Sequence, residues 1–402
     1  MSTTTAVGGS SAWGRAPDVV IVGAGVVGAA CALAASRAGL AVTVVDRGPL
    51  AGGTSSGGEG NLLVSDKPAG PELLLALHSL GHWQDVAAHL EEVTGHPLGG
   101  IELEHKGGLM VASRPETVAV LDRIADGQRA LGVEAIQVGP ESLPDLEPHL
   151  APGLAGGVLY PQDGQLQPVL ATATLLAAAR RLGAVVRTEV EVTGLMRTGD
   201  RVRGVILAGG ARIEASRVVN AAGPWAGQLA ALAGVHLPIL PRRGVVLVTQ
   251  PLPPLVRRKV YAAEYVSNVA SDSAGLESSA VVEGTPSGTI LIGASRERVG
   301  FDPAIPTAVV RRLAAQAVEL FPVLAGARLL RTYRGYRPYT PDHLPVIGED
   351  PRAPGLIHAC GHEGAGIVLA AGTGQLVAEL LTGAPPSADL GPLGPARFEG
   401  AA

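Results

Sequence analysis

Asp18-Val-Val-Ile-Val-Gly-Ala-Gly-Val-Val-Gly28 decides the fold of this chain. Its apolar first half predicts a buried strand, and its glycines, spaced Gly-x-Gly-x-x-Gly, predict a tight turn into a helix over residues 29–38. Gly39 ends that helix, and a second apolar run over residues 41–45 leads to Asp46. These segments together predict a strand–helix–strand unit of the dinucleotide-binding kind.

Each part of this motif has a physical task. Gly23 allows the turn, Gly25 lets a pyrophosphate approach the backbone, and Gly28 lets the helix pack closely. The first N–H groups of the helix and the positive end of its dipole favour phosphate. Asp46 lies where a carboxylate can bind ribose hydroxyls. The alternative is a glycine-rich turn without a ligand, which the complete unit makes much the weaker interpretation.

Composition narrows the function classes. With 402 residues, 47% of them hydrophobic, the chain can bury two cores, so we expect two domains that share a ligand. A net charge of −5 without a basic stripe argues against nucleic acid as a partner. Cys31 and Cys360 have neither metal-binding nor disulfide spacing, which favours a reduced, cytoplasmic protein.

No transmembrane segment is expected. Residues 19–45 are apolar enough to resemble a membrane span, but the turn glycines, Arg37 and the helix end at Gly39 contradict that interpretation. The first sixteen residues are small and polar and lack the apolar core of a signal peptide, so they are interpreted as a flexible leader.

Apolar periodicity organises the rest of the chain. Helices are predicted over residues 71–95, 115–131, 166–182 and 307–320, and a glycine-rich last helix over 364–381 is capped by Gly383. Strands are predicted over 107–112, 184–187, 202–207, 211–215 and 218–223. Four more short strands, over 245–249, 256–262, 279–283 and 289–294, predict an antiparallel sheet.

The predicted fold class is α/β (α+β overall), with a Rossmann-like dinucleotide domain that an antiparallel-sheet substrate domain interrupts. We assign residues 17–98, 160–238 and 334–390 to the first domain and 99–159 and 239–333 to the second. Residues 1–16 form the leader and 391–402 a C-terminal tail.

Tyrosines gather around one arginine. Five of the six lie in two clusters: Tyr261 and Tyr265, and then Tyr333, Tyr336 and Tyr339 around Arg337. Aromatic rings about a guanidinium suit a small carboxylate with an apolar body. Ordinary strand packing is the alternative for any single tyrosine.

The chain resembles the FAD-dependent amino acid and amine oxidoreductases of the D-amino acid oxidase, glycine oxidase and sarcosine oxidase superfamily, over residues 19–398. Four segments carry the resemblance: Val20–Gly28, Gly53-Thr-Ser-Ser-Gly-Gly-Glu-Gly-Asn61, Val218-Val-Asn-Ala-Ala-Gly-Pro-Trp225, and Gly335–Gly348 followed by Gly361-His-Glu-Gly-Ala-Gly-Ile367. Within the superfamily it is most similar to the β-subunit type of hydroxyproline dehydrogenase, opine oxidase and hydrogen cyanide synthase. The segments 242–249, 293–298 and 358–366 carry that likeness.

The resemblance implies FAD as cofactor. No cysteine lies near Tyr333, where monomeric sarcosine oxidases attach their flavin, so we expect non-covalent FAD. Besides Gly23, Gly25, Gly28 and Asp46, the residues implied in FAD binding are Val26, Val27, Arg47, Thr54, Ser55, Ser56, Gly60, Asn61, Leu62, Val190, Ala222, Gly223, Trp225, Gly361, His362, Gly364, Ala365, Gly366 and Ile367.

The resemblance also implies a substrate site. Arg337 matches the arginine that binds the substrate carboxylate in the amino acid oxidases, and Tyr265 and Tyr339 are pocket candidates. His362 is a candidate catalytic residue, although backbone placement by the neighbouring glycines is the favoured interpretation. A hydride would pass from the substrate α-carbon to flavin N5, so that few protein groups are needed.

Four functional hypotheses remain. The leading one is a dehydrogenase of a proline-like, opine-like or D-amino acid that works with iron–sulfur and NAD(P)H-dehydrogenase-like partner subunits. The second is a self-sufficient glycine- or sarcosine-type oxidase that makes hydrogen peroxide. A nicotinamide-dependent dehydrogenase and a non-catalytic FAD-holding subunit are the others. No metal site is predicted, because His78 and His82, four residues apart, fit a solvated helix face better.

Overall fold

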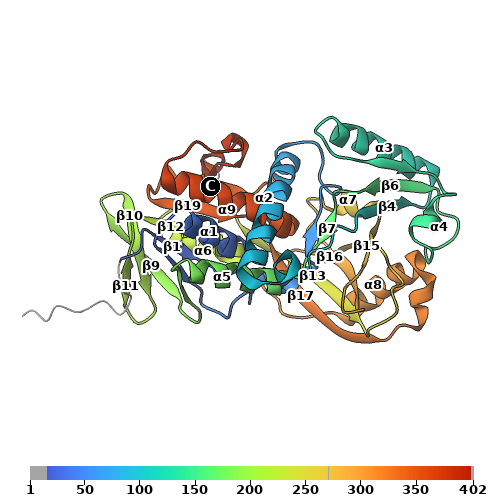
Figure 1. Ribbon diagram of the computed structural model, residues 1–402, viewed down its shortest axis with the longest axis horizontal. Helices are drawn as coiled ribbons and strands as arrows, with labels where there is room; N and C mark the ends of the chain where they lie inside the picture. Colours follow the sequence, from blue (N-terminus) through green and yellow to red (C-terminus); the bar gives the residue numbers. More distant parts are fainter. Residues whose placement is uncertain (1–15, 270, 400–402) are drawn as a thin grey trace, which may run out of the picture.

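The computed structural model describes residues 16–269 and 271–399. One lobe contains β1, β12, β19, α1 and α9, and the other contains β4, β6, β15, α3 and α8, with α2 between them (Figure 1). A sheet forms the centre of each lobe, and each sheet has its own hydrophobic core. A Rossmann-like parallel sheet combined with a largely antiparallel second sheet confirms the predicted fold class.

The first lobe is built on a six-stranded sheet in the order β18-β19-β12-β1-β2-β8. Its strands are β1 (Val19–Val22), β2 (Val42–Val45), β8 (Val185–Arg187), β12 (Arg217–Asn220), β18 (Val346–Glu349) and β19 (Leu356–Cys360). All neighbours pair in parallel except β18, which runs antiparallel to β19. The predicted strand–helix–strand unit is therefore present at its centre, and both faces of β1 are buried.

Helix α1 (Val26–Arg37) begins three residues earlier than predicted, directly after Gly25. Most of its residues are alanine or other small residues, and nine of its twelve residues are buried. Small side chains let neighbouring helices approach it closely, and α5 (Pro168–Arg181) and α9 (Gly366–Thr382) both pack on it. Gly374 of α9 shows how close they are, because a Cβ there would lie 2.7 Å from the Ala30 carbonyl.

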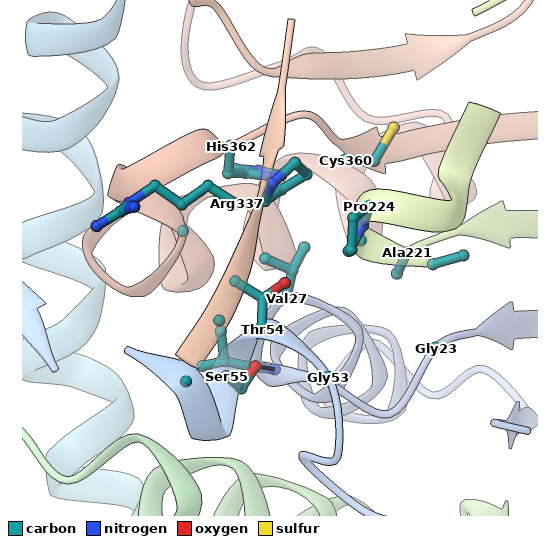
Figure 2. A pocket seen from close by; sticks show the side chains of 18 of the residues that line it. Gly23, Val27, Gly53, Thr54, Ser55, Ala221, Pro224, Arg337, Cys360 and His362 are labelled. Carbon is teal, nitrogen blue, oxygen red and sulfur yellow. Dashed lines mark hydrogen bonds between the residues drawn. The ribbon is translucent and has the colours of Figure 1, made fainter. Parts of the chain in front are cut away.

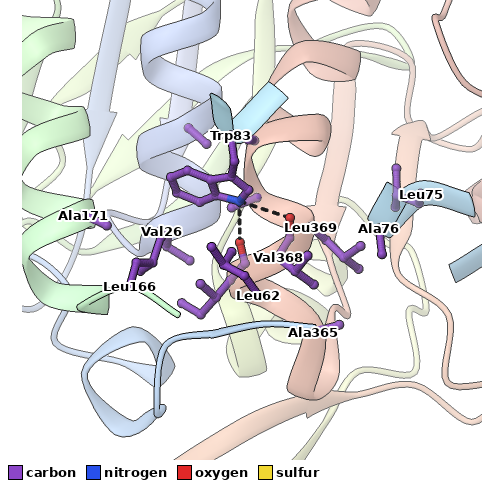
Figure 3. Packing of buried hydrophobic residues seen from close by; sticks show 14 of the residues in the cluster. Val26, Leu62, Leu75, Ala76, Trp83, Leu166, Ala171, Ala365, Val368 and Leu369 are labelled. Atoms are coloured by element: carbon purple, nitrogen blue, oxygen red, sulfur yellow. Dashed lines mark hydrogen bonds between the residues drawn. The ribbon is translucent and has the colours of Figure 1, made fainter. Parts of the chain in front are cut away.

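Helix α2 (Pro71–Thr94) crosses α9 at a contact that inserts side chains into the backbone of α9. Ser79 Oγ donates to Val368 O at 2.5 Å and accepts from Gly372 N at 2.8 Å, so it bridges one turn of α9. Trp83 Nε1 donates to the carbonyls of Ile367 and Val368, at 3.0 and 3.1 Å (Figure 3). These bonds hold the first turn of α9 in place.

The second lobe is built on an eight-stranded sheet in the order β17-β13-β16-β15-β14-β4-β6-β5. Its strands are β4 (Gly108–Ala112), β5 (Ile136–Val138), β6 (Gly156–Tyr160), β13 (Leu240–Thr249), β14 (Lys259–Ala262), β15 (Glu277–Gly284), β16 (Ile290–Arg296) and β17 (Leu329–Tyr339). Only the β14–β4 pair is parallel. The helices of this lobe are α3 (Pro115–Arg129), α4 (Leu143–Leu146), α7 (Glu264–Val269) and α8 (Thr307–Leu320).

Sequence patterns missed parts of both lobes. The Tyr/Arg/Pro-rich segment, for which no strand was predicted, forms β17 and pairs with β13 along its whole length. The predicted hairpin over 202–215 has a third strand, because β10 (Arg201–Leu207) pairs with β9 (Val192–Thr198) as well as with β11 (Arg212–Glu214). Polar, half-exposed residues in β9 hid its alternation. The domain division stays a prediction, and β17 continues past its boundary at 333.

One described helical segment, Glu363–Thr382, is long and apolar enough to cross a membrane. Within it, 67% of the apolar window is buried inside the protein, in contact with α1 and α2. A helix that is apolar on all sides is expected where it lies in the core of a large domain. The predicted leader, residues 1–16, lies almost entirely outside the described residues.

Replacing Trp83 by Phe tests the α2–α9 contact. The variant keeps an aromatic ring but loses two hydrogen bonds to the first turn of α9 and part of the buried indole, so the free energy of unfolding should fall by about 1–3 kcal/mol. Chemical denaturation followed by far-UV circular dichroism measures the change. Leu74→Ala, at an exposed position of the same helix, serves as control and should stay within about 0.5 kcal/mol of wild type. Equal stability of wild type and Trp83→Phe would contradict the role given to this contact.

Candidate functional site

A cavity of about 590 Å³ runs from the glycine turn before α1 to strand β17, between the two sheets. Figure 2 shows Gly23, Val27, Thr54, Ser55, Arg337 and His362 around it. Both lobes contribute to its walls, as the shared-ligand prediction requires. Most sequence-predicted site residues line it: Gly23, Gly25, Val26, Val27, Asp46, Arg47, Thr54, Ser55, Gly60, Asn61, Val190, Ala222, Gly223, Trp225, Tyr265, Arg337, His362, Gly364, Ala365, Gly366 and Ile367.

The glycine turn at one end is shaped by close backbone approaches. Gly23 has a φ of +121°, and a Cβ there would lie 2.2 Å from the carbonyl oxygen of Ala221. A Cβ on Gly28 would lie 2.0 Å from the Gly23 carbonyl, so the third glycine packs against the turn itself. A Cβ on Gly25 would come within 4 Å of Ser55 Oγ alone among the atoms of residues 16–269 and 271–399, its chain neighbours excepted. The turn therefore leaves the cavity side of Gly25 open for a ligand.

Acidic and aromatic side chains surround the same end of the cavity. Asp46 Oδ2 accepts from Ala24 N at 2.7 Å and Oδ1 accepts from Gly48 N at 2.8 Å, which fixes the carboxylate beside the turn. The guanidinium of Arg47 lies 4.3 Å from the ring centroid of Trp225. Val190 N donates to the Asp46 carbonyl at 2.7 Å. Asp46, Arg47, Val190 and Trp225 therefore all line this end of the cavity.

The loop over residues 53–61 connects the two lobes along the cavity. Ser55 Oγ accepts from Val26 N, the first N–H of α1, at 2.9 Å. Thr54 Oγ1 donates to the carbonyl of Tyr336 in β17 at 2.5 Å. Gly57 and Gly335 touch, since a Cβ on Gly57 would lie 2.5 Å from the Gly335 Cα. The loop contains the 3₁₀ turn η1 (Thr54–Gly57) and ends at β3 (Asn61–Leu62).

The segment that precedes α9 closes another wall. His362 is 2% exposed, its Nε2 contacts Thr373 Oγ1 at 3.0 Å, and burial lowers its pKa to about 3. A histidine that stays neutral and bonded inside the core has little to offer as an acid or base at neutral pH. Glu363 accepts from Arg242 Nη1 at 2.8 Å and contacts His343 Nδ1 at 2.8 Å. Although burial acts to raise the pKa of Glu363, these contacts hold it below its ordinary value.

Arg337 lies at the β17 end of the cavity and reaches across the neighbouring strand. Its Nη1 donates to the carbonyl of Ser295 in β16 at 2.9 Å, passing over Gly244 of β13. A Cβ on Gly244 would lie 2.2 Å from that Nη1, so the glycine provides the space for the crossing. Among the described residues no carboxylate pairs with Arg337, and its side chain lines the cavity.

A second guanidinium, that of Arg296, lines the same end. It is 4% exposed and lies 5.2 Å from the ring centroid of Tyr265, and no ion pair to it is found in the described part of the chain. Burial lowers the pKa of Arg296, and the positive charge of Arg337 acts in the same direction. Arg296 lies in the segment 293–298, which carries part of the family resemblance, but it was not predicted as a site residue.

Three acids also line this end: Glu59 lies inside the quoted segment 53–61 but was not proposed as a site residue, whereas Asp66 and Glu72 lie in none of the quoted motifs. Glu59 is buried, and its Oε1 has no hydrogen-bond partner among the described residues. Asp66 pairs with Lys67 at 2.6 Å. Burial raises the pKa of Glu72, in the first turn of α2, to about 7. The substrate end of the cavity is therefore rich in charge.

Five predicted site residues do not line the cavity. Gly28 and Gly361 shape the backbone behind it, and Leu62 is part of the core. Ser56 is exposed and donates to Gly53 O at 3.1 Å. Tyr339 is buried outside the cavity, where its hydroxyl donates to Asp272 Oδ1 at 3.1 Å.

The chain is similar to known proteins along nearly its whole length. Residues 18–380 match the family described as DAO, FAD dependent oxidoreductase. The chain belongs to this family. It is 31% identical over 386 residues to glycine oxidase of Geobacillus kaustophilus, covering 95% of this chain and 97% of that protein. It is 28% identical over 424 positions to hydrogen cyanide synthase subunit HcnC of Pseudomonas aeruginosa, covering 96% and 97%.

Two solved structures have the same fold as this chain. The crystal structure of glycine oxidase from Geobacillus kaustophilus is 30% identical, with a TM-score of 0.85 and coverage of 95% of this chain and 98% of that one. L-proline dehydrogenase from P. horikoshii is 25% identical, also with a TM-score of 0.85, covering 95% and 97%. Membership of the family makes this protein an FAD-dependent oxidoreductase.

The residues present fit FAD. The open side of Gly25 and the first N–H groups of α1 suit the pyrophosphate. Asp46 and Trp225 would hold the adenosine half, and small residues of the 53–61 loop would let the backbone approach the flavin ring. The segment 362–367, which leads into the N-terminus of α9, would meet the other edge of the ring.

The buried His362 predicts a pH effect on stability. Its pKa, about 3 in the folded protein, lies below the ordinary 6.5, so the folded state resists its protonation. The corresponding stability is complete above about pH 6.5 and is lost as the pH falls toward 3. Between pH 7 and pH 5 the loss should be about 2 kcal/mol.

His362→Gln should remove that loss, so urea denaturation at the two pH values should show a difference about 2 kcal/mol smaller than in wild type. His149→Gln, at an exposed position, is the control and should match wild type. An unchanged difference in His362→Gln would show that His362 is not the neutral, buried group described.

Proposed function

We propose that this protein dehydrogenates the C–N bond of an amino or imino acid. FAD, when bound, supplies the hydride-accepting chemistry at its N5 atom. The single observation that carries the proposal is Arg337, a guanidinium without a carboxylate partner in the described chain, at the far end of the cavity from the phosphate turn. A planar, permanently charged fork is the side chain best suited to bind a substrate carboxylate.

The surrounding residues orient the substrate for this reaction. Arg337 would bind the carboxylate in two places, which fixes the direction of the α-carbon. The ring of Tyr265, 5% exposed, provides an apolar wall. Glu72 is a candidate proton acceptor for the substrate ammonium, because a group with a pKa near 7 exchanges protons readily at neutral pH. No part of this mechanism requires a nucleophile or a metal.

The electron acceptor separates two versions of the proposal. In the leading version the electrons pass to partner subunits of the iron–sulfur and NAD(P)H-dehydrogenase-like kind, as the likeness to the β-subunit type suggests. The relative HcnC is a subunit of hydrogen cyanide synthase, which supports that version. In the second version the protein is a self-sufficient oxidase, and the 31% identity to glycine oxidase favours it.

Anaerobic titration of the isolated holoenzyme distinguishes these versions. Bleaching of the flavin spectrum by proline, hydroxyproline, sarcosine, glycine, a D-amino acid or an opine would identify the substrate class. Rapid return of colour with peroxide on admitting air would identify an oxidase. A flavin that stays reduced in air would identify a dehydrogenase that needs a partner.

Replacing Arg337 by Gln tests the carboxylate site. The variant should lose about a hundredfold in kcat/KM for the substrate that bleaches the flavin, because a charge-assisted pair contributes about 1.5–3 kcal/mol. FAD content should not change. Arg331→Gln, which removes an exposed charge on the same strand, is the control and should behave as wild type. Unchanged turnover of every carboxylate substrate by Arg337→Gln would refute the assignment.

Glu72 should control the pH dependence of turnover. Its carboxylate is ionised and able to accept a proton only above its pKa of about 7, so kcat/KM should rise with pH through that region. In Glu72→Gln the rise of kcat/KM with pH through this region should be absent. A profile that keeps the same rise in the variant would assign it to another group or to the substrate amine.

A further inference from the structure

The substrate end of the cavity has an imbalance of charge. Glu363 is paired with Arg242 and contacts His343, and Asp66 is paired with Lys67, so these groups are compensated within the protein. Arg296 and Arg337 have no carboxylate partner in residues 16–269 and 271–399. Burying a guanidinium without a counter-charge is expensive, and such a group is expected where a ligand supplies the missing charge.

The two guanidiniums are neighbours but are held separately. Arg337 donates to the carbonyl of Ser295, the residue directly before Arg296. Arg296 instead lies against the Tyr265 ring at 5.2 Å. Arg337 is anchored to the backbone, whereas no hydrogen bond of the Arg296 side chain is found within the described residues. The substrate end therefore contains two guanidiniums without a carboxylate partner in the described residues, of which Arg337 is sufficient for one carboxylate.

We propose, building on the proposed function, that the substrate is a dicarboxylic amino or imino acid whose second carboxylate binds Arg296. A buried anion of the protein completes the match. Glu59 lines the same cavity, and its buried Oε1 lacks a partner among the described residues. The two guanidiniums complement two carboxylates, and the carboxyl groups of Glu59 and Glu72 are available to one ammonium; these are the charges of an N-(carboxyalkyl) amino acid.

Chain geometry supports a role in binding over a role in folding. Arg296 ends strand β16, where its neighbours Glu297 and Arg243 already pair with each other at 2.8 Å. That pair stabilises the edge of the sheet without help from Arg296. Removing an uncompensated buried cation should leave the ligand-free protein at least as stable as wild type, whereas removing a structural arginine would destabilise it.

Binding of unreactive acids to the holoenzyme tests the proposal. Glutarate and butyrate differ by one carboxylate, and each can be titrated at constant ionic strength by its perturbation of the flavin spectrum. Wild type should bind glutarate about ten- to a hundredfold more tightly than butyrate. Arg296→Gln should lose that preference while its affinity for butyrate stays within about twofold. Arg298→Gln, a half-buried charge two residues on that does not line the cavity, should keep it.

Kinetics with iminodiacetate and sarcosine, a second pair that differs by one carboxylate, should show the same pattern if either is a substrate. Arg296→Lys keeps the charge without the planar fork and should give an intermediate glutarate preference. Thermal unfolding of the apo forms should show Arg296→Gln to be no less stable than wild type.

Each other result has a distinct meaning. Equal binding of glutarate and butyrate by wild type would overturn this inference and leave the proposed function intact. An equal loss of affinity for glutarate and butyrate in Arg296→Gln would also overturn it, because the two arginines would then bind the same carboxylate. Loss of FAD or of folding in both Arg296 variants would make Arg296 structural. Failure of wild type to bind either acid would overturn the proposed function as well.

Discussion

The loop over residues 53–61 is the connection on which the site depends. Its hydroxyl groups bind the first N–H of α1 on one side, through Ser55, and the backbone of β17 on the other, through Thr54. The contact of Gly57 with Gly335 brings the two backbones together with no side chain between them. The phosphate turn belongs to one sheet and Arg337 to the other, so this loop sets the distance between the cofactor site and the substrate site.

Electrostatic cost and function are linked at the substrate end. Protein interiors tolerate buried ions when partners are present, as in the pairing of Lys259 with Glu283 beneath the loop, where Lys259 also donates to Asn61. Arg296 is an exception among the described residues, because no carboxylate pairs with it, whereas Glu59 lies near Lys259. Its position next to the cavity indicates that the uncompensated charge of Arg296 is kept for a ligand, at the expense of the stability of the empty protein.

Much of the fold could be predicted because its signals are local. Gly23, Gly25 and Gly28 encode a turn whose steric demands the packing confirms, and the α8 period predicted a helix with the observed ends. Strand β17 was missed because its arginines and tyrosines alternate with neither face clearly apolar, and its pairing with β13 depends on residues about ninety positions away. Tertiary pairing decided that segment, as it often does for strands.

The site residues also fall into those that local motifs predict and those that depend on the folded structure. Residues in motifs, such as Asp46 and the segment 362–367, could be placed near a cofactor from the sequence. The roles proposed for Arg296 and Glu72 could not be predicted, because they depend on burial and on charged neighbours, which a single sequence does not show. Tyr339 illustrates the reverse error, since its nearness to Arg337 in sequence suggested a shared pocket, whereas its ring is buried outside the cavity.

Because Arg337 crosses over Gly244, three strands determine the position of its guanidinium. Its anchor is a main-chain oxygen of β16, its path is the bare backbone of β13, and its origin is β17. The absence of a side chain at position 244 thus determines where the Arg337 guanidinium can lie. A directed-evolution library at that position would move the acid-binding point while keeping the arginine, a route to altered substrate range that leaves the chemistry intact.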